Sequence, residues 1–191
     1  MKKEEILLMV KETEVRLTPF CTCEGLALHG ISHLRRVSIL SGRLASAVGE
    51  DVEAAVVMGF LHDCARTDDK AGDGHAHDSS VLARCLLGRF YPHLDADRIC
   101  HAIARHADGE VTDDGLAACL WDADRLELKR IGREIDLDLL STEVARRLAR
   151  ARAARRRRTG VARGLQVGRV GENFIIRFRC AAEGACIAPP A

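Results

Sequence analysis

Hydrophobic residues along most of this chain recur at intervals of three or four positions, and Gly or Pro separates the periodic stretches. Such spacing is typical of amphipathic α-helices, and the alternation of a half-buried strand is absent before about residue 165. The pattern therefore predicts an all-α fold. Helices are expected over about 3–17, 31–48, 52–64, 79–90, 95–107 and 113–131, with a seventh from about 141. Thr112 is expected to cap the sixth helix.

The end of the chain departs from this pattern. Its sequence GLQVGRVGENFIIRFRC (164–180) alternates around a Gly-Glu-Asn turn, which predicts a small β-hairpin. Charge changes as well: residues 1–140 hold 17 Lys and Arg against 25 Asp and Glu, whereas residues 141–191 hold 12 Arg against three Glu. We therefore predict an N-terminal helix and lead-in (1–24), a helical domain (25–140) and a basic C-terminal extension (141–191).

Composition excludes several classes of protein. The chain has 191 residues, of which 47% are hydrophobic, and this is enough to bury one core of useful size. No stretch of about 18 apolar residues occurs, so we expect no membrane-spanning helix. The eight cysteines form no CxxC pair, which argues against a zinc ribbon. In the absence of a signal-peptide pattern, the thiols are expected to be reduced and the protein cytoplasmic.

Four imidazole or carboxylate side chains fall on the apolar faces of four different predicted helices. Residues three, four or seven apart share one face of a helix. By this test the inward-facing residues are His33, His62, His106 and Asp124. Asp122 lies about 200 degrees from Asp124 around its helix and is expected to face elsewhere. A buried aspartate needs a cation or hydrogen-bond donors, so these positions predict a shared site.

Asp63 directly follows His62 and adds a second carboxylate to this candidate site. No cysteine joins the set, so all its donor atoms are nitrogen or oxygen. A single inward His is more often a satisfied core residue, but the joint pattern favours a metal site. Donors of this kind suit Fe, Mn, Co, Ni, Mg or Zn better than a soft metal. The sequence leaves open which of these metals binds.

The same residues resemble the HD-domain metal-dependent phosphohydrolase superfamily. The resemblance covers about 25–135 and rests on HGISHLRRV (29–37), GFLHDCAR (59–66), HAHDSS (75–80), AIARHADG (102–109) and LWDADRLEL (120–128). The chain resembles in particular small bacterial HD proteins with a CWDADRLDL-like segment. Members of the superfamily fold as all-α bundles around a buried metal site, and the resemblance implies this fold for 25–140.

The resemblance also implies a set of metal ligands. The four metal positions of the superfamily fall on His33, His62, Asp63 and Asp124. Members that bind two metals use two further histidines, which match His75 and His106. His77 is the competing register, because Ala76 and Ser80 stand where the pattern has Gly and Ala. One or two divalent ions are therefore implied, with Asp63 able to bridge two of them.

The implied activity is cleavage of a phosphate ester of a nucleotide or another small phosphorylated substrate by metal-activated water. Catalytic roles are predicted for Asp63, Arg36 and Arg66, because each arginine stands three residues after an expected ligand and could hold phosphate by paired hydrogen bonds. Substrate contacts are predicted at His29, Arg36, Arg66, Lys70 and Arg125. A surface ion pair is the alternative for each arginine, and a helix start is the alternative for His29.

Two other functions stay open at this stage. A minority of the superfamily are di-iron oxygenases, and a non-catalytic HD protein could bind a nucleotide or nucleic acid. The arginine-rich run RRLARARAARRRR (146–158) could be a solvated helix face, could pair with an acidic body of its own or of a second subunit, or could bind nucleic acid or anionic lipid. Few aromatic residues interrupt the run, so base stacking is not indicated.

Overall fold

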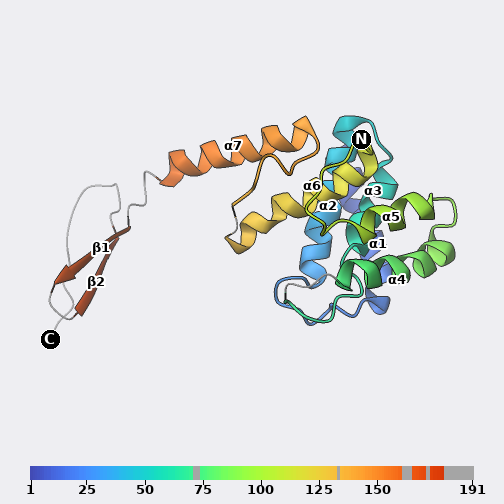
Figure 1. Ribbon diagram of the computed structural model, residues 1–191, viewed down its shortest axis with the longest axis horizontal. Helices are drawn as coiled ribbons and strands as arrows, with labels where there is room; N and C mark the ends of the chain where they lie inside the picture. The colour runs from blue at the N-terminus through green and yellow to red at the C-terminus, as the bar shows by residue number, and fades with distance from the viewer. Residues whose placement is uncertain (71–73, 133, 161–164, 171–172, 179–191) are drawn as a thin grey trace. The chain divides into compact units, whose positions relative to one another are not determined.

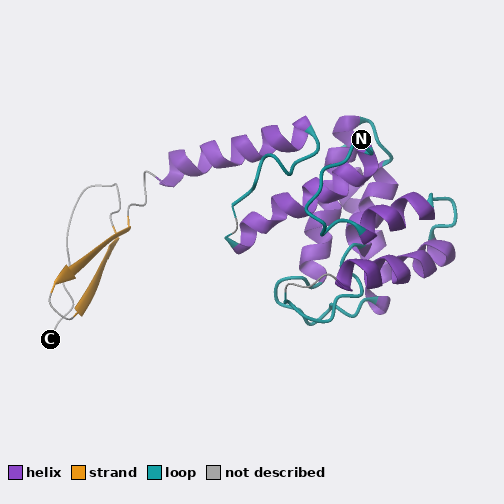
Figure 2. Cartoon of the chain, in the orientation of Figure 1, coloured by secondary structure: helices purple, strands orange, loops and turns teal. Residues whose placement is uncertain are grey.

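The computed structural model describes residues 1–70, 74–132, 134–160, 165–170 and 173–178, with side chains up to residue 155 apart from residue 131. The chain divides into two compact units, Met1–Ala149 and Arg150–Ala191. The described part of the first unit is helical (Figures 1 and 2), which confirms the predicted fold class. The second unit begins at Arg150, whereas the basic extension was predicted from 141.

The helices follow the expected order along the chain. Those of the described residues are α1 (Lys3–Leu17), α2 (Ile31–Val48), α3 (Val52–Leu61), α4 (Gly74–Phe90), α5 (Ala96–Ala104), α6 (Gly115–Glu127) and α7 (Glu143–Gly160), with 3-10 turns η1 (Thr18–Phe20) and η2 (Leu128–Ile131). The bounds of α1 and α2 match the predicted ranges. α2 ends before Gly49, whose left-handed conformation (φ 85°) suits a residue without a Cβ atom.

α2 packs extensively against α3 and α6. Leu34 on α2, Phe60 on α3 and Leu120 on α6 are fully buried between these helices and their neighbours. Close approach of α3 to α2 depends on Gly59, because a Cβ atom there would lie 2.8 Å from the Cα atom of Ser38. This contact brings the C-terminal end of α3 to the N-terminal half of α2, where ligands were predicted on both segments.

The C-terminal ends of α3 and α5 come earlier than predicted. α3 ends at Leu61 rather than near 64, and α5 ends at Ala104 rather than near 107. A histidine follows each end, His62 and His106, and its ring donates a hydrogen bond to a carbonyl of the last helical turn. The ring adds a side-chain donor to the last turn, and at α5 the Ile103 carbonyl also accepts from the His106 backbone N–H at 3.3 Å.

Two helix starts also differ from the prediction. α4 begins at Gly74 rather than near 79, so His75 lies in its first turn. The prediction of Thr112 as the cap of α6 is wrong, because the carboxylate of Asp114 accepts the hydrogen bond from the Ala117 N–H. Thr112 supports this cap instead, since its Oγ1 accepts from the Asp114 N–H at 3.1 Å. Both residues are good caps, and the carboxylate lies nearer the first helical turn.

The second unit holds the predicted hairpin. β1 (Leu165–Val170) and β2 (Asn173–Phe178) pair antiparallel, with Val170 opposite Asn173. Residues 171 and 172 of the predicted turn, and the cysteines at 180 and 186, lie outside the described residues.

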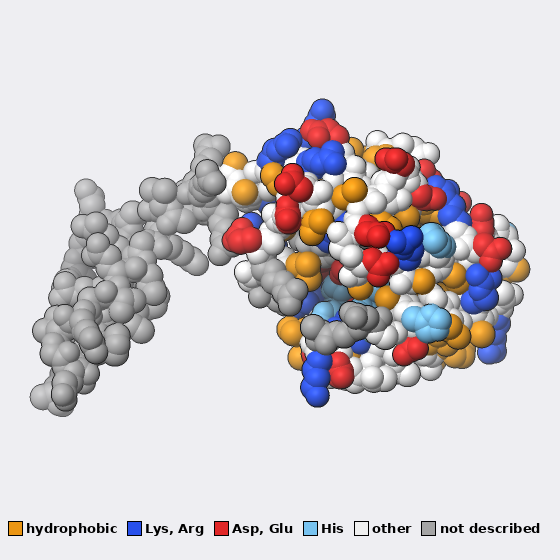
Figure 3. All heavy atoms as spheres, viewed as in Figure 1, with side chains coloured by type: hydrophobic (Ala, Val, Ile, Leu, Met, Phe, Trp, Pro, Cys, Tyr) orange, Lys and Arg blue, Asp and Glu red, His pale blue; other side chains and the backbone are white. Residues whose placement is uncertain are grey.

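α7 begins within the helical unit. Its first turns pack on the core through Val144 and Leu148, and Ala145 and Ala149 are buried beside them. On the face of the molecule shown in Figure 3, acidic and basic side chains lie intermixed over the helical unit. Among the described helices, none combines the length and apolar character needed to cross a membrane.

Candidate metal centre

The side chains predicted as metal ligands come together in the helical unit. They are His33 in the first turn of α2, His62 and Asp63 in the turn after α3, His75 in α4, His106 in the turn after α5 and Asp124 near the end of α6. The centre is therefore built at the ends of five helices. Four of the six residues are buried, whereas His75 and Asp124 are partly exposed.

A first group of donor atoms surrounds the Nε2 atom of His62. The Nε2 atom of His33 lies 3.2 Å from it, and the Oδ1 atom of Asp124 lies 3.7 Å from it. Oδ2 of Asp63 lies 3.8 Å from the same nitrogen. Oδ1 of Asp124 is also 3.3 Å from Nε2 of His33. Helices α2, α3 and α6 therefore present two imidazoles and two carboxylates to one another.

A second group surrounds the Oδ1 atom of Asp63. Nε2 of His75 lies 3.5 Å from this oxygen, and Nε2 of His106 lies 3.6 Å from it. The rings of His75 and His106 meet edge to face, with centroids 5.3 Å apart. His77 is exposed on the same helix as His75, so the structure brings His75 to the group and leaves His77 at the surface. Asp63 thus presents one oxygen to each group.

Backbone carbonyls orient two of the imidazoles. Nδ1 of His62 donates to the Gly59 carbonyl at 2.9 Å, and Nδ1 of His106 donates to the Ile103 carbonyl at 2.7 Å. Both bonds reach back three residues into the helix that precedes the histidine. Because Nδ1 carries the proton, Nε2 is left as the lone-pair donor that faces Asp63. This is the tautomer that metal ligation through Nε2 requires.

The buried charges of the centre depend on one another. Burial lowers the pKa of His62 to about 4, although Asp63 and Asp124 oppose this effect. Burial would raise the pKa of Asp63, but His62, His106 and the Arg66 guanidinium together hold that pKa well below its usual range. Burial would lower the pKa of His106, but the neighbouring Asp63 carboxylate outweighs burial and raises it. Asp63 and Asp124 are therefore ionised and His62 is neutral at pH 7, the states that metal ligation requires, whereas a bound cation would have to displace the proton that Asp63 favours on His106.

The residues of the centre fit a divalent cation. Within the described residues, Oδ1 of Asp63 is buried without a hydrogen-bond partner, and such an orphaned carboxylate oxygen is costly unless a cation satisfies it. Three ligand sets, each with its donor atoms within 4.8 Å of one another, are His33 with His62 and Asp63, His62 with His106 and Asp124, and Asp63 with His75 and His106. Imidazole and carboxylate donors suit the borderline and hard metals named above.

Arg66 is held beside Asp63 by three acceptors. Its Nη1 lies 3.3 Å from Oδ2 of Asp63, its Nε donates to the Asp68 carbonyl at 2.9 Å, and its Nη2 donates to the Lys70 carbonyl at 2.6 Å. The guanidinium thus orients the carboxylate and shapes the loop that follows it. A hollow of about 310 Å³ opens here, with Arg66, Lys70, His75 and Asp78 in its lining.

The other two predicted arginines have protein partners. Arg36 forms an ion pair with Glu127 through its Nε atom. Arg125 is mostly buried, donates through Nη1 to the Leu139 carbonyl and lies over the ring of Trp121 at 5.7 Å from its centroid. The structure therefore places Arg36 in an ion pair between α2 and α6, and it directs Arg125 toward the segment after α6.

His29 lies beside the first group and has a partner that the sequence did not indicate. Its ring meets the ring of His33 edge to face, with centroids 5.5 Å apart. Its Nδ1 lies 3.0 Å from Oδ1 of Asp69. Asp69 stands in a polar loop without periodicity, so helical spacing could not identify it. Its one sequence signal is its position shortly after the His62-Asp63 pair.

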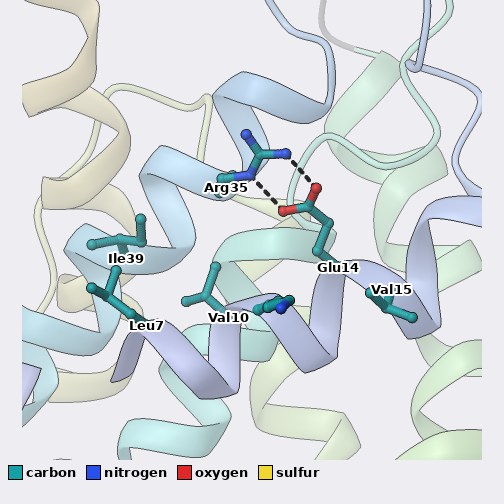
Figure 4. A pocket seen from close by; sticks show the side chains of 7 residues that line it. Leu7, Val10, Glu14, Val15, Arg35 and Ile39 are labelled. Atoms are coloured by element: carbon teal, nitrogen blue, oxygen red, sulfur yellow. Dashed lines mark hydrogen bonds and ion pairs between the residues drawn. The ribbon is translucent and has the colours of Figure 1, made fainter. Parts of the chain in front are cut away.

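A larger hollow lies away from these residues. It has a volume of about 400 Å³ and is lined by α1 and α2, with Leu7, Val10 and Ile39 among its apolar residues (Figure 4). Its carboxylate, Glu14, is paired with the guanidinium of Arg35, so this lining offers no set of metal ligands. We therefore place the candidate site at the smaller hollow beside His75, where the candidate metal ligands lie.

Comparison with known proteins identifies the family of the chain. The model of the HD domain family matches residues 30–129, which is more than half of the chain, and the chain therefore belongs to the HD domain family. It is similar to a crystal structure from an uncultured Thermotogales bacterium, described as a predicted HD superfamily hydrolase. The two are 28% identical with a TM-score of 0.58, over 83% of this chain and 88% of that chain. A search of curated proteins found no match.

Proposed function

We propose that this protein is a metal-dependent phosphohydrolase that cleaves a phosphate ester of a nucleotide or another small phosphorylated substrate with metal-activated water. The HD domain family and the likeness to a protein described as an HD superfamily hydrolase support a hydrolytic activity. The observation that carries the proposal is the position of Asp63, whose two carboxylate oxygens face two different groups of imidazoles.

The residues of the centre have separate tasks in this mechanism. One or two divalent cations, when bound, would bring the pKa of water from 15.7 to about 7 and would neutralise charge that develops on the phosphoryl oxygens. His33, His62 and Asp124 would hold the first cation, and His75 and His106 would hold a second. Asp63 bridges the two groups, and Arg66 holds its carboxylate in place. Catalysis of this kind relies on positioning and electrostatics, which these fixed side chains supply.

Substrate is expected to reach the centre where its ligands are accessible. His62 is fully buried, whereas the side chains of Asp124 and His75 are 19% and 14% exposed. Lys70 lines the hollow beside His75 and can meet a phosphate as a point charge. Arg66 already has three partners, so we assign it to Asp63 rather than to substrate. Arg36 would have to exchange its bond to Glu127 before it could bind a phosphate.

A screen of metals and substrates tests the proposal. Purified protein is loaded separately with Mn, Co, Ni, Mg, Fe or Zn and incubated with a panel of nucleotides and other phosphate esters, with release of phosphate as the readout. His62→Ala removes a central ligand, and His93→Ala is its matched control, because His93 is an exposed histidine paired with Glu53. We expect bound metal and phosphate release for wild type and His93→Ala, and neither for His62→Ala.

Other results would contradict the proposal in distinct ways. Wild-type metal content in His62→Ala would show that the ion binds elsewhere. Oxygen consumption by the iron-loaded protein with no phosphate release would identify an oxygenase on this scaffold. Nucleotide binding without turnover by any metal-loaded form would indicate a binding module.

A further inference from the structure

Asp69 joins two loops at the rim of the metal centre. Its Oδ2 accepts a hydrogen bond from the Ala27 N–H at 3.0 Å, and its Oδ1 accepts from the His29 N–H at 3.0 Å. The Leu28 nitrogen lies 3.2 Å from both oxygens. Nδ1 of His29 lies 3.0 Å from Oδ1 and completes the set. Three consecutive backbone donors and one ring donor therefore converge on a single carboxylate.

The two loops that Asp69 joins each border a ligand-bearing segment. The turn at 27–29 leads into α2, and its His29 ring packs against the ring of His33. The loop that carries Asp69 follows the His62-Asp63 pair, and Arg66 binds the carbonyls of this loop while it contacts Asp63. A displacement of Asp69 would therefore shift both the turn that precedes His33 and the loop that follows Asp63.

The hydrogen bonds of Asp69 keep its carboxylate charged and orient the ring of His29. Burial alone would raise the pKa of Asp69, but the bonds from Leu28, His29 and Ala27 hold it below its usual value, so the carboxylate stays charged. A carboxylate that accepts from Nδ1 sets the orientation of the imidazole and leaves Nε2 as the ring atom that can contact a ligand. A neutral amide replaces the carboxylate only in part, because an amide has one acceptor oxygen.

We infer that Asp69 is a positioning residue, which holds His29 against His33 so that Nε2 of His29 is presented to the substrate beside the metal centre. The inference rests on the proposed function, because it supposes that a phosphate ester approaches the metal centre at this rim. Asp69 itself touches no predicted metal ligand in the hydrogen bonds described, and it acts through His29.

A matched pair of substitutions tests this role. Asp68 precedes Asp69 in the same loop, carries the same charge and accepts from the Lys70 N–H within that loop at 2.8 Å. We expect Asp69→Ala to lower kcat/KM by about 10- to 100-fold, the scale that mispositioning of a reacting group produces. Asp68 is exposed and lines the hollow beside His75 but has no contact with His29, so Asp68→Ala should lower kcat/KM by about twofold, clearly less than Asp69→Ala. Metal content should match wild type in both.

A double substitution separates positioning from a structural role. If Asp69 acts through His29, Asp69→Ala should cost little in a His29→Ala background, because the two losses are then not additive. Fully additive losses, or equal effects of Asp69→Ala and Asp68→Ala, would overturn the inference. Asp69→Asn keeps the shape of the side chain and one acceptor oxygen, so it should give an intermediate loss of kcat/KM. If the alanine variant does not fold, Asp69→Asn is compared with and without His29→Ala in its place.

A second readout keeps this test separate from the proposed function. Nitrogen NMR of the His29 ring, assigned by its absence in His29→Ala, reports which ring nitrogen carries the proton. We expect a proton on Nδ1 in wild type and Asp68→Ala, and loss of this preference in Asp69→Ala. An unchanged His29 ring in Asp69→Ala would overturn the inference. If wild type hydrolyses no phosphate ester, the proposed function fails, but the NMR comparison still decides whether Asp69 positions His29.

Discussion

Two carboxylates on α6, only two residues apart, meet opposite environments. Asp124 faces the imidazoles of the metal centre, with its Oδ1 3.3 Å from Nε2 of His33. Asp122 is fully buried on the other side of the helix and accepts from the Ser141 N–H at 2.7 Å, the Thr142 N–H at 2.8 Å and the Thr142 hydroxyl at 2.7 Å. One carboxylate is surrounded by potential metal ligands, and the other is satisfied by hydrogen-bond donors.

This difference separates a candidate metal ligand from a structural carboxylate. Burial raises the pKa of Asp122 despite its hydrogen bonds, whereas the nearby imidazoles of His33 and His62 outweigh burial and hold the pKa of Asp124 well below its usual value. Asp122 fixes the segment before α7, because the Thr142 hydroxyl that it binds also accepts from the Ala145 N–H. The ligand side of α6 therefore builds the centre, and the opposite side attaches the next helix.

The largest expected effect is loss of metal when the ligand side is altered. Asp124→Ala removes a carboxylate from the first group, and metal affinity should fall by about 100-fold or more, since even partners of metal ligands are worth 10- to 100-fold. Asp122→Ala should retain metal but lower the free energy of unfolding by about 3 kcal/mol, because it leaves the partly buried N–H donors of Ser141 and Thr142 unpaired. Elemental analysis and denaturant unfolding of both proteins measure the two effects.

The comparison would fail if these effects were exchanged. Wild-type metal content in Asp124→Ala, or metal loss in an Asp122→Ala protein that unfolds like wild type, would mean that the two carboxylates have been assigned the wrong way round. Asp122→Asn keeps one acceptor and should lose less stability than the alanine variant.

A second prediction concerns the approach of α3 to α2, which supports the ligand side. Gly59→Ala would place a Cβ atom 2.8 Å from the Cα atom of Ser38, and the backbone would have to shift. We expect a loss of about 1–3 kcal/mol in the free energy of unfolding, together with weaker metal binding, because His62 would move away from His33.

The matched control for this change is Gly88→Ala on α4. Nothing lies within 4 Å of a Cβ atom at Gly88, so alanine should be neutral or should stabilise the helix by up to about 1 kcal/mol. Titration of the metal-free proteins with Mn or Co measures the affinity. Equal metal affinity of Gly59→Ala and Gly88→Ala would show that the centre tolerates separation of α2 and α3.

A third prediction repeats the comparison on α4, where His75 and His77 also stand two residues apart. Nε2 of His75 lies 3.5 Å from Oδ1 of Asp63, whereas His77 is exposed. His75→Ala should remove the metal of the second group and leave the first, so that metal content falls by about one ion per chain where two bind. His77→Ala should leave metal content and activity unchanged. Equal loss in the two variants would reject His75 as the ligand.

Helical spacing was sufficient to predict much of the fold and most of the centre. Gly and Pro end α1 and α2 within the chain itself, so their bounds follow from the sequence. His33 and Asp124 share faces with apolar residues, and this local pattern places them inward before any tertiary contact is known. Both positions lie within residues 30–129, which match the HD domain family.

The remaining features depend on residues that are distant in the sequence. The partner of Arg36 is Glu127, and the partner of Arg125 is the Leu139 carbonyl, so neither contact follows from spacing on one helix. The ends of α3 and α5 differ from the prediction, and near each end a histidine ring donates to a carbonyl of the last helical turn. Asp69 lies in a loop without periodicity, and its partners become evident only when two loops are placed together.

The smallest expected effect concerns the salt dependence of binding by α7, the helix that follows the segment bound by Asp122. α7 holds eight Arg and one Glu, and binding to the phosphates of nucleic acid is the one of its three open alternatives that predicts a strong salt dependence. Arg147, Arg150 and Arg155 are exposed, and their replacement by Gln should make the slope of log affinity against log salt less negative by about 0.7–0.9 for each phosphate that the helix no longer neutralises.

The matched control replaces Arg43, Arg84 and Arg89, which are exposed on α2 and α4. Fluorescence anisotropy with labelled duplex DNA and single-stranded RNA between about 50 and 200 mM salt gives these slopes. Equal slopes for the two triple variants would show that the charge of α7 does not select this partner, and binding of anionic vesicles in place of nucleic acid would assign the helix to a lipid surface.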